Sequence, residues 1–327
     1  MLAQIRSIGA YVPENAVTND QLAETVDTSD EWIRSHTGIG KRHIATDDQA
    51  ASDLAVRAVN IAMERAGMSP EELDLIILAT ASGDYPGFPS TACIVQEAIG
   101  AVNAGALDIS AGCTGFVYGL EMARGMIVSG CSKNILVAGV EVLTHITNWK
   151  DRDTCVLFGD GAGAAVVTSG EDGGSGILDS ILRAEGSGAP YLIRKAGGSR
   201  QPYTGKDDAY QDLFIQMDGQ KVYKFAVRVN TDLVGMFFQR HNLTIDDIAY
   251  IVPHQANVRI IQAAAKRLGI PMEKFYLNIE EYANTSAASI PLALNEMSEK
   301  GILKRGDLIL TLGFGAGLTY GGNLIRW

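Results

Sequence analysis

Cys113 has the surroundings best suited to nucleophilic chemistry in this chain. It lies in the turn Ser110-Ala-Gly-Cys-Thr-Gly115, between a strand expected at 107–109 and an apolar helix expected at 113–129. The N-terminus of a helix presents unpaired N–H groups and the positive end of its dipole, and both favour a thiolate by lowering its pKa. The neighbouring glycines allow a sharp turn and a close approach by a substrate. A buried, unreactive cysteine is the alternative that this pattern leaves open.

A histidine and an asparagine have comparable positions later in the chain. His254 follows the strand-like run Tyr250-Ile-Val-Pro253, and Asn284 precedes a helix expected at 285–300. Open α/β sheets bind ligands at the carboxyl ends of their strands, which makes both residues candidates for a site. Taken singly, His254 could equally be a capping or core histidine, and Asn284 a plain helix N-cap.

The other cysteines and histidines show no pattern that suggests chemistry. Cys93, Cys131 and Cys155 are expected to be small core residues, and no pair has the C-x-x-C spacing of a structural zinc site. The remaining histidines also lack metal-ligand spacing. We therefore expect no metal site.

Two glycine-rich runs suggest different roles. The run 313–322 could offer backbone N–H groups to an oxyanion, or could be a tight turn between strands. The run 158–164 does not match the phosphate-binding loop pattern, so we interpret it as structural.

The elements that carry these residues repeat along the chain. A helix ending at Gly67 is followed by a turn at Ser69 and a strand at 73–79; a helix at 224–242 is followed by a turn at Thr244 and a strand at 248–252. The two turns are 175 residues apart. This order predicts a duplicated α/β chain with halves 1–170 and 171–327, each a mostly parallel sheet covered by helices.

The repeat extends to the next units and brings the candidate residues together. Strands expected at 107–109 and 132–139 correspond to strands expected at 276–279 and 307–313. Asn284 then lies within about one residue of the counterpart of Cys113, so related halves would bring thiol, imidazole and amide into one pocket. The segment 185–212 breaks the pattern and is expected to be a loop over a surface or a substrate.

Composition excludes several classes of protein. The 327 residues are 46% hydrophobic and 20% charged, so disorder is excluded. A net charge of −11 argues against general nucleic-acid binding. No apolar run is long enough for a membrane span and no signal-peptide pattern is present, so we expect a cytoplasmic protein without membrane insertion.

Three motifs together resemble one family. They are Gly112-Cys-Thr-Gly-Phe116, His254-Gln-Ala-Asn257 and Asn284-Thr-Ser-Ala-Ala-Ser289, and they resemble the β-ketoacyl-acyl-carrier-protein synthase III family of the thiolase superfamily. The runs 28–33, 37–39 and 158–164 also fit, and the likeness extends from end to end. The resemblance implies a thiolase-like fold with two α/β halves in five layers (αβαβα), and a homodimer.

The family's activity would be an acyltransferase that starts type II fatty acid synthesis. The resemblance implies that Cys113 takes an acyl group from acyl-CoA, with acetyl or another short acyl group expected, as a thioester. His254 and Asn284 would stabilise the enolate formed when malonyl-acyl carrier protein loses CO₂, and the product would be a 3-oxoacyl-acyl carrier protein. The backbone N–H groups of Cys113 and Ala316 would form the oxyanion hole. Acyl-CoA is a substrate here, and no cofactor is implied.

The resemblance also assigns binding residues. For CoA and substrate they are Thr28, Trp32, His36, Arg152, Gly219, Asn257, Phe88 and Phe314. Trp32 and Arg152 would sandwich the adenine, Gly219 and Asn257 would contact the pantetheine, and the two phenylalanines would line the acyl end. Many members have arginine in place of His36, and an uncharged histidine would weaken the contact with the CoA phosphate.

An acidic carrier protein requires a basic patch on this acidic chain. The helix after His254 carries three basic residues with no acidic residue before Glu273. We expect the docking patch to consist of Arg259, Lys266, Arg267, Lys221 and Lys224. An ordinary solvated helix face is the alternative.

Related chemistries are less consistent with the sequence. A biosynthetic thiolase needs a second cysteine in the C-terminal glycine loop, and no cysteine follows Cys155. Elongating synthases use a second histidine where this chain has Asn284, and HMG-CoA synthase needs a glutamate near Ala81. A specialised relative with another starter, as in polyketide synthesis, remains the main alternative, followed by a catalytically silent scaffold.

Overall fold

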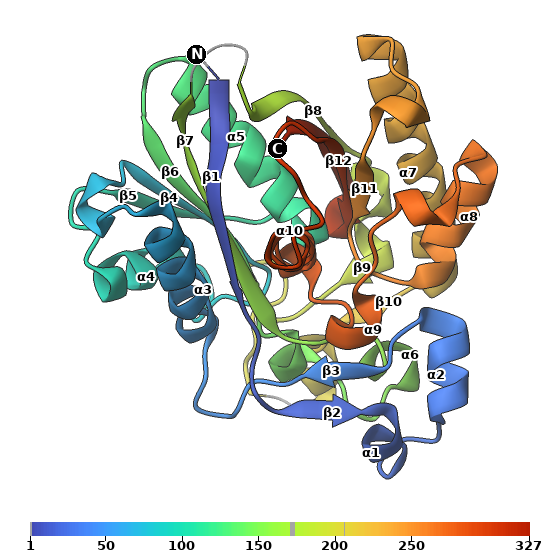
Figure 1. Cartoon of the computed structure of the whole chain (residues 1–327). Helices are drawn as coiled ribbons and strands as arrows, with labels where there is room; N and C mark the ends of the chain where they lie inside the picture. The colour runs from blue at the N-terminus through green and yellow to red at the C-terminus, as the bar shows by residue number, and fades with distance from the viewer. Residues whose placement is uncertain (1, 171–173, 206) are drawn as a thin grey trace.

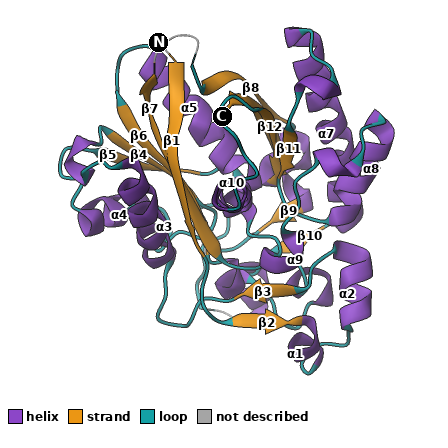
Figure 2. Ribbon diagram, viewed as in Figure 1, coloured by secondary structure: helices purple, strands orange, loops and turns teal. Residues whose placement is uncertain are grey.

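The computed structural model describes residues 2–170, 174–205 and 207–327 (Figures 1 and 2). The strands are β1 (Leu2–Tyr11), β2 (Ala16–Thr18), β3 (Lys41–His43), β4 (Leu75–Ala79), β5 (Gly105–Ile109), β6 (Asn134–Glu141), β7 (Gly161–Gly170), β8 (Gly176–Ala184), β9 (Leu192–Ile193), β10 (Gln216–Met217), β11 (Tyr250–Pro253), β12 (Leu308–Gly315) and β13 (Thr319–Arg326). The helices are α1 (Asn19–Ala23), α2 (Asp30–Thr37), α3 (Ala51–Ala66), α4 (Thr91–Ile99), α5 (Gly115–Val128), α6 (Arg152–Cys155), α7 (Gly219–His241), α8 (Val258–Leu268), α9 (Ile279–Tyr282) and α10 (Ser289–Glu299).

Two sheets with corresponding strand orders form the frame of the molecule. One has the order β1-β7-β6-β4-β5 and the other the order β8-β13-β12-β11. In each, the first two pairings are antiparallel and the pairings beyond β6 or β12 are parallel. The expectation of mostly parallel sheets is therefore only partly met. β12 turns back into β13 within a few residues, too short a connection for a parallel crossover.

Helices and sheets alternate in five layers. Helices α3 and α4 cover the outer face of the first sheet, and α7 and α8 cover the outer face of the second (Figures 1 and 2). Helices α5 and α10 lie between the sheets, where both are packed on two sides. This is the expected αβαβα arrangement. The expected boundary between residues 170 and 171 falls beside residues 171–173, which lie outside the described residues.

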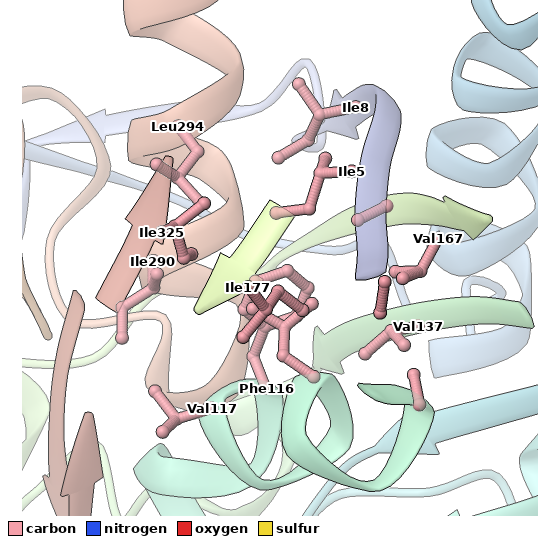
Figure 3. Close-up of a cluster of buried hydrophobic side chains, with 14 of the residues drawn as sticks. Ile5, Ile8, Phe116, Val117, Val137, Val167, Ile177, Ile290, Leu294 and Ile325 are labelled. Carbon is pink, nitrogen blue, oxygen red and sulfur yellow. The ribbon is translucent and has the colours of Figure 1, made fainter. Parts of the chain in front are cut away.

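The central layer joins the two halves through apolar side chains. Figure 3 shows Phe116 of α5 and Ile290 of α10 among residues from both sheets, including Ile5 of β1 and Ile325 of β13. All of these side chains are buried, at most 3% exposed. Burying them stabilises the fold by roughly 1.5–3 kcal/mol per large side chain. Because α5 and α10 are fixed on both sides, the turns at their N-termini are held firmly.

Most expected elements are present, but one expected strand does not form, and two cysteines are not buried as expected. The strand expected at 276–279 does not form, because the chain makes only an isolated bridge between Phe275 and Ile251 before turning into α9. Cys93 and Cys131 are exposed, so the expectation that they are core residues was wrong, whereas Cys155 is buried.

No helix among the described residues has the length and apolar character needed to span a bilayer.

Candidate active site

The loop that carries Cys113 is held by residues about 200 positions later in the chain. Cys113 lies in a single helical turn before α5, at the end of β5. The Thr319 hydroxyl donates to the Ala111 carbonyl at 2.8 Å and lies 2.9 Å from the Thr114 hydroxyl. A Cβ atom on Gly315 would lie only 2.6 Å from the Cys113 nitrogen. Glycine at 315 therefore allows the C-terminal loop to approach Cys113 this closely.

Burial controls the protonation of Cys113 in the empty site. The residue is 8% exposed. Burial raises the pKa of the Cys113 thiol to about 12, and the Glu141 carboxylate adds to the rise. The Ser286 hydroxyl and the backbone N–H groups of Cys113 and Ala316 act in the opposite direction. The expectation of a lowered pKa was therefore wrong for the unliganded enzyme, because desolvation outweighs the N–H groups at the helix start.

His254 lies at the carboxyl end of β11, in the second sheet, whereas β5 belongs to the first. Its backbone nitrogen donates to Leu312 of β12 at 2.7 Å, and its Nδ1 is 2.7 Å from the Ser289 hydroxyl. The ring of Phe314 contacts the imidazole edge-on at a centroid distance of 5.0 Å. Burial lowers the pKa of His254 to about 3, so the ring is neutral near pH 7. Because Nδ1 is engaged with Ser289, Nε2 is the nitrogen available to a substrate.

Asn284 is oriented by its own turn. The backbone N–H of Ser286 donates to the Asn284 Oδ1 atom at 2.9 Å, and the Asn284 N–H donates to Leu157 at 2.9 Å. Because the backbone N–H of Ser286 is a donor, the atom of the Asn284 amide that faces it must be the oxygen. The Nδ2 amide group of Asn284 is therefore available to donate into the pocket. The N-cap of α10 is Ala288, so the helix-cap alternative for Asn284 was wrong.

These three residues share one pocket. Cys113, His254 and Asn284 all line a cavity of about 880 Å³. A thiol, two neutral N–H donors and two backbone N–H groups near the sulfur thus converge on one space. Such a set can form a thioester and stabilise negative charge on two different carbonyl oxygens. Among the described residues, no cluster of side chains has the composition of a metal site.

The outer part of the same pocket contains several residues expected to bind CoA. Trp32, His36, Gly219 and Asn257 all line it. His36 stacks on Trp32 at a centroid distance of 4.4 Å, and the Arg152 guanidinium lies 5.1 Å from the Trp32 ring centroid. Adenine can enter between Trp32 and Arg152 only if the arginine swings outward.

Thr28 and Asn257 have hydrogen-bonding environments that the sequence did not indicate. The Thr28 hydroxyl is buried, and no hydrogen-bond partner is found for it among the described residues. Asn257 caps α8 by accepting from the backbone of Arg259 at 2.8 Å, and it donates to the His36 carbonyl at 3.0 Å. One N–H of the Asn257 amide is therefore already used within the protein.

A smaller chamber lies on the other side of Cys113. It has a volume of about 110 Å³ and is lined by Cys113 and mostly apolar residues: Ala81, Leu143, Ile146, Phe158, Leu192, Ile193 and Ile215, with Gly112, Arg194, Ser286 and Ala316. These aliphatic residues could not be identified from the sequence, because an apolar residue in a loop carries no signal of contact with a ligand. Leu192 and Ile193 come from the segment 185–212 that interrupts the repeat, and Ile215 follows that segment by three residues.

The two phenylalanines expected at the acyl end are placed differently. Phe314 lines the large pocket beside His254 and does not line the small chamber. Phe88 is 86% exposed and lines neither space. Within one chain, then, neither side chain lines the small chamber beside Cys113.

The expected carrier patch lies on α7 and α8. All five basic residues, Arg259, Lys266, Arg267, Lys221 and Lys224, are exposed. Lys221 pairs with Asp218 at 3.1 Å and lies over the Tyr191 ring. Arg259 also donates from Nε to the Ser35 carbonyl of α2 at 3.0 Å. Arg259 therefore connects the patch to the helix that carries Trp32.

Comparisons with known proteins point to one family. Residues 107–186 match the family model "3-Oxoacyl-[acyl-carrier-protein (ACP)] synthase III", and residues 238–327 match the model of its C-terminal part. A beta-ketoacyl-[acyl-carrier-protein] synthase III from Caldanaerobacter subterraneus is 52% identical over 99% of this chain and 98% of its own length.

Solved structures agree with this match. A 3-oxoacyl-[acyl-carrier-protein] synthase III from Aquifex aeolicus superposes with a TM-score of 0.91 at 45% identity, covering 99% of this chain and 100% of that one. A priming β-ketosynthase of the R1128 polyketide pathway is 34% identical with a TM-score of 0.91, covering 99% and 96%. The chain therefore belongs to the β-ketoacyl-acyl-carrier-protein synthase III family of condensing acyltransferases.

Proposed function

We propose that this enzyme moves an acyl group from acyl-CoA to Cys113 and condenses it with malonyl-acyl carrier protein. The products are free CoA, CO₂ and a 3-oxoacyl-acyl carrier protein, as expected of the step that starts type II fatty acid synthesis. One observation carries the proposal: Cys113, His254 and Asn284 line the same pocket, with two backbone N–H groups at the sulfur.

The first half-reaction forms a thioester on Cys113. The sulfur attacks the acyl-CoA carbonyl, and the backbone N–H groups of Cys113 and Ala316 stabilise the resulting oxyanion. The carbon–sulfur bond to CoA then breaks, and the thiol proton leaves with the CoA thiolate, directly or through solvent. The high pKa of the resting thiol supports attack coupled to proton loss, with no free thiolate present beforehand.

The second half-reaction uses the other two side chains. The malonyl thioester oxygen accepts hydrogen bonds from His254 Nε2 and Asn284 Nδ2, and CO₂ leaves as an enolate develops on that oxygen. The enolate carbon attacks the acyl-Cys113 carbonyl, and collapse releases the cysteine. A neutral imidazole suits this step because it donates a hydrogen bond without giving up its proton. These steps use side-chain and backbone groups only, so we propose no cofactor.

Acyl-CoA and the carrier arm would enter through the large pocket. The pair of Trp32 and Arg152 supports adenine binding, since each can stack on a purine. The unpartnered Thr28 hydroxyl lies close in sequence to Trp32 and would gain a partner from a bound nucleotide. The basic patch on α7 and α8 supports docking of an acidic carrier protein beside the same pocket.

The small chamber supports a short acyl starter. Its volume of about 110 Å³, beside the Cys113 thiol, accommodates a few carbon atoms and excludes long chains. We therefore propose acetyl-CoA or another short acyl-CoA as the first substrate. A specialised enzyme with a different starter is the second candidate, favoured by the likeness to the polyketide priming synthase.

We also propose a homodimer that acts in the cytoplasm. Strand β5 is at the edge of its sheet, so its outer hydrogen-bonding groups can pair with a second copy. Phe88 is 86% exposed, unusual for so large an apolar side chain. In a dimer built along β5, Phe88 would be covered by the second copy and could line that copy's acyl chamber.

The decisive test is intact mass after incubation with a panel of acyl-CoAs. Short acyl-CoAs should add one acyl group to the wild-type protein and none to Cys113→Ala, and malonyl-acyl carrier protein should remove it. Labelling by long chains only, or discharge onto another acceptor only, would favour the specialised enzyme. If none of the acyl-CoAs forms an adduct, the result would favour the catalytically silent scaffold.

A further inference from the structure

The Ser289 hydroxyl is the group that decides which nitrogen of His254 carries the proton. A neutral imidazole has one N–H, and its other nitrogen is an acceptor. The proposed second half-reaction needs the proton on Nε2, because that atom must donate to the malonyl thioester. Nδ1 must then be an acceptor, and it needs a donor in a fully buried place. The only group within hydrogen-bond distance of Nδ1 among the described residues is Ser289 Oγ, at 2.7 Å.

Ser289 has two acceptors for one hydroxyl hydrogen. Besides His254 Nδ1 at 2.7 Å, the Ser286 carbonyl lies 2.9 Å from Oγ. That carbonyl already accepts the backbone N–H of Ser289. The backbone N–H of Gln255 approaches Oγ at 3.4 Å and supplies a donor to the serine oxygen.

One arrangement gives every donor one acceptor and every acceptor one donor. Ser289 N–H pairs with the Ser286 carbonyl, Gln255 N–H with Ser289 Oγ, and Ser289 O–H with His254 Nδ1. In the opposite arrangement, the Ser286 carbonyl and Ser289 Oγ would each accept two hydrogen bonds. The shorter contact of the hydroxyl is also the one to the imidazole.

We propose that Ser289 is a positioning residue that donates to His254 Nδ1 and thereby holds the proton on Nε2. The inference rests on the proposed function. Both residues are almost completely buried, His254 at 1% and Ser289 at 2% exposure, so water does not substitute for the hydroxyl. Gln255 fixes the approach, because its side-chain amide is bonded to Pro253, Tyr276 and Asn278.

The segment 284–289 then orients both donors to the enolate oxygen. Ser286 N–H holds the Asn284 amide with its nitrogen toward the pocket, and Ser289 O–H holds His254 in the matching protonation state. The first half-reaction uses the N–H groups of Cys113 and Ala316 instead. Loss of the Ser289 hydroxyl should therefore affect the two half-reactions unequally.

The test measures the half-reactions separately in Ser289→Ala. Acylation of Cys113 is followed by intact mass in a single turnover, and discharge is followed after mixing pre-acylated enzyme with malonyl-acyl carrier protein. We expect acylation to stay within about threefold of wild type and discharge to fall roughly tenfold or more, short of the ~10²–10³-fold loss on removing a direct oxyanion donor. Ser289→Thr, which keeps the hydroxyl, should restore most of the discharge rate.

A matched control and a spectroscopic measurement exclude a merely structural role. The control variant Ser52→Ala also removes a buried hydroxyl, which donates to Asp84 at 2.6 Å. Because Ser52 lies away from this pocket, the control should leave the rates of acylation and discharge unchanged. The ¹⁵N shifts of a ¹⁵N-histidine-labelled sample should show His254 protonated on Nε2 in the wild type and a mixture of tautomers in Ser289→Ala. A wild type protonated on Nδ1, or equal loss of both rates in Ser289→Ala, would overturn the inference. Failure of the wild type to be acylated or discharged would instead count against the proposed function, and the ¹⁵N result would still decide the role of Ser289.

Discussion

At the scale of single residues, the site combines a thiol and an imidazole that are both neutral at rest. Burial pushes the pKa of Cys113 up to about 12 and that of His254 down to about 3. A thiolate–imidazolium pair, as in cysteine proteases, is therefore disfavoured in the empty pocket. Charge develops only when a substrate carbonyl is present to share it. Because the thiolate is the form that reacts with oxidants and alkylating agents, we expect Cys113 to react slowly with them in the empty pocket.

Glu141 is the buried acidic residue whose charge should modulate the pKa of Cys113. Its Oε2 atom accepts from Ser82 at 2.5 Å and from Ala81 at 3.0 Å, while Oε1 is buried without a partner among the described residues. Glu141→Gln removes a negative charge that raises the pKa of Cys113. We expect faster alkylation of Cys113 by iodoacetamide at any pH from 7 to 9, by a few-fold, with the rate profile displaced to lower pH. An unchanged profile would mean that Glu141 is uncharged in the native enzyme, which is the form that burial favours.

His36 provides the second prediction at this scale. It lines the pocket, and its Nδ1 is 2.8 Å from the Trp32 carbonyl, so Nε2 is free for a ligand. His36→Arg places a permanent charge where the CoA phosphates are expected. The KM for acyl-CoA should fall about two- to fivefold, the range for a partly exposed ion pair, with little change in kcat. The gain should shrink as salt is added, and a gain insensitive to salt would argue against a phosphate contact.

At the scale of elements, the repeat predicted most of the elements around the site and the approach of Cys113, His254 and Asn284, but not the contacts that hold these residues in place. Gly67 ends α3 in the left-handed conformation, as its place in the sequence indicated, and Gly269 ends α8 in the same way. The repeat predicted strands β4 and β11 and the helices that follow the catalytic turns. The contact of Thr319 with Ala111, and that of Ser289 with His254, could not be predicted. Each depends on the distance between segments, and sequence spacing does not determine that distance.

The link between α2 and α8 separates two roles of the basic patch. Arg259 is bonded to Ser35 of α2, whereas Lys266 lies about two turns further along α8. Arg259→Ala should raise KM for both acyl-CoA and malonyl-acyl carrier protein, because α2 carries Trp32. Lys266→Ala should raise only the KM for the carrier protein. Steady-state kinetics with each substrate varied in turn distinguishes the two, and equal effects of both variants on acyl-CoA would contradict this assignment.

The small chamber gives an element-scale prediction about the starter. Ala81 follows β4, and Ile146 lies on a half-buried turn after β6. Ala81→Val narrows the chamber and should slow acylation by butyryl-CoA at least tenfold more than acylation by acetyl-CoA. Ile146→Ala widens it and should extend acylation to longer chains. Competition between acetyl-CoA and butyryl-CoA, followed by intact mass, gives the ratio of the two acylation rates directly. An unchanged ratio in both variants would mean that the acyl group does not bind in the small chamber.

At the scale of the whole molecule, we expect assembly to complete the site. Phe88→Asp introduces a charge at a side chain that we expect a second copy to cover. Sedimentation should show wild-type protein at twice 34.9 kDa and the variant shifted toward that single-chain mass, with slower acylation. Met236→Asp is the control, because Met236 is also partly exposed but lies on α7, outside the proposed interface. A variant that remains dimeric would argue against a dimer built along β5.

The support given to Cys113 by residues from the far end of the chain affects how the protein is made. The turn around Cys113 leaves the ribosome about 200 residues before Gly315 and Thr319, which shape it. Throughout that interval the growing chain lacks the backbone N–H of Ala316, and for most of it the chain also lacks His254 and Asn284. A nascent chain should therefore be unable to consume acyl-CoA, and activity should begin only after the last strands have been synthesised and inserted.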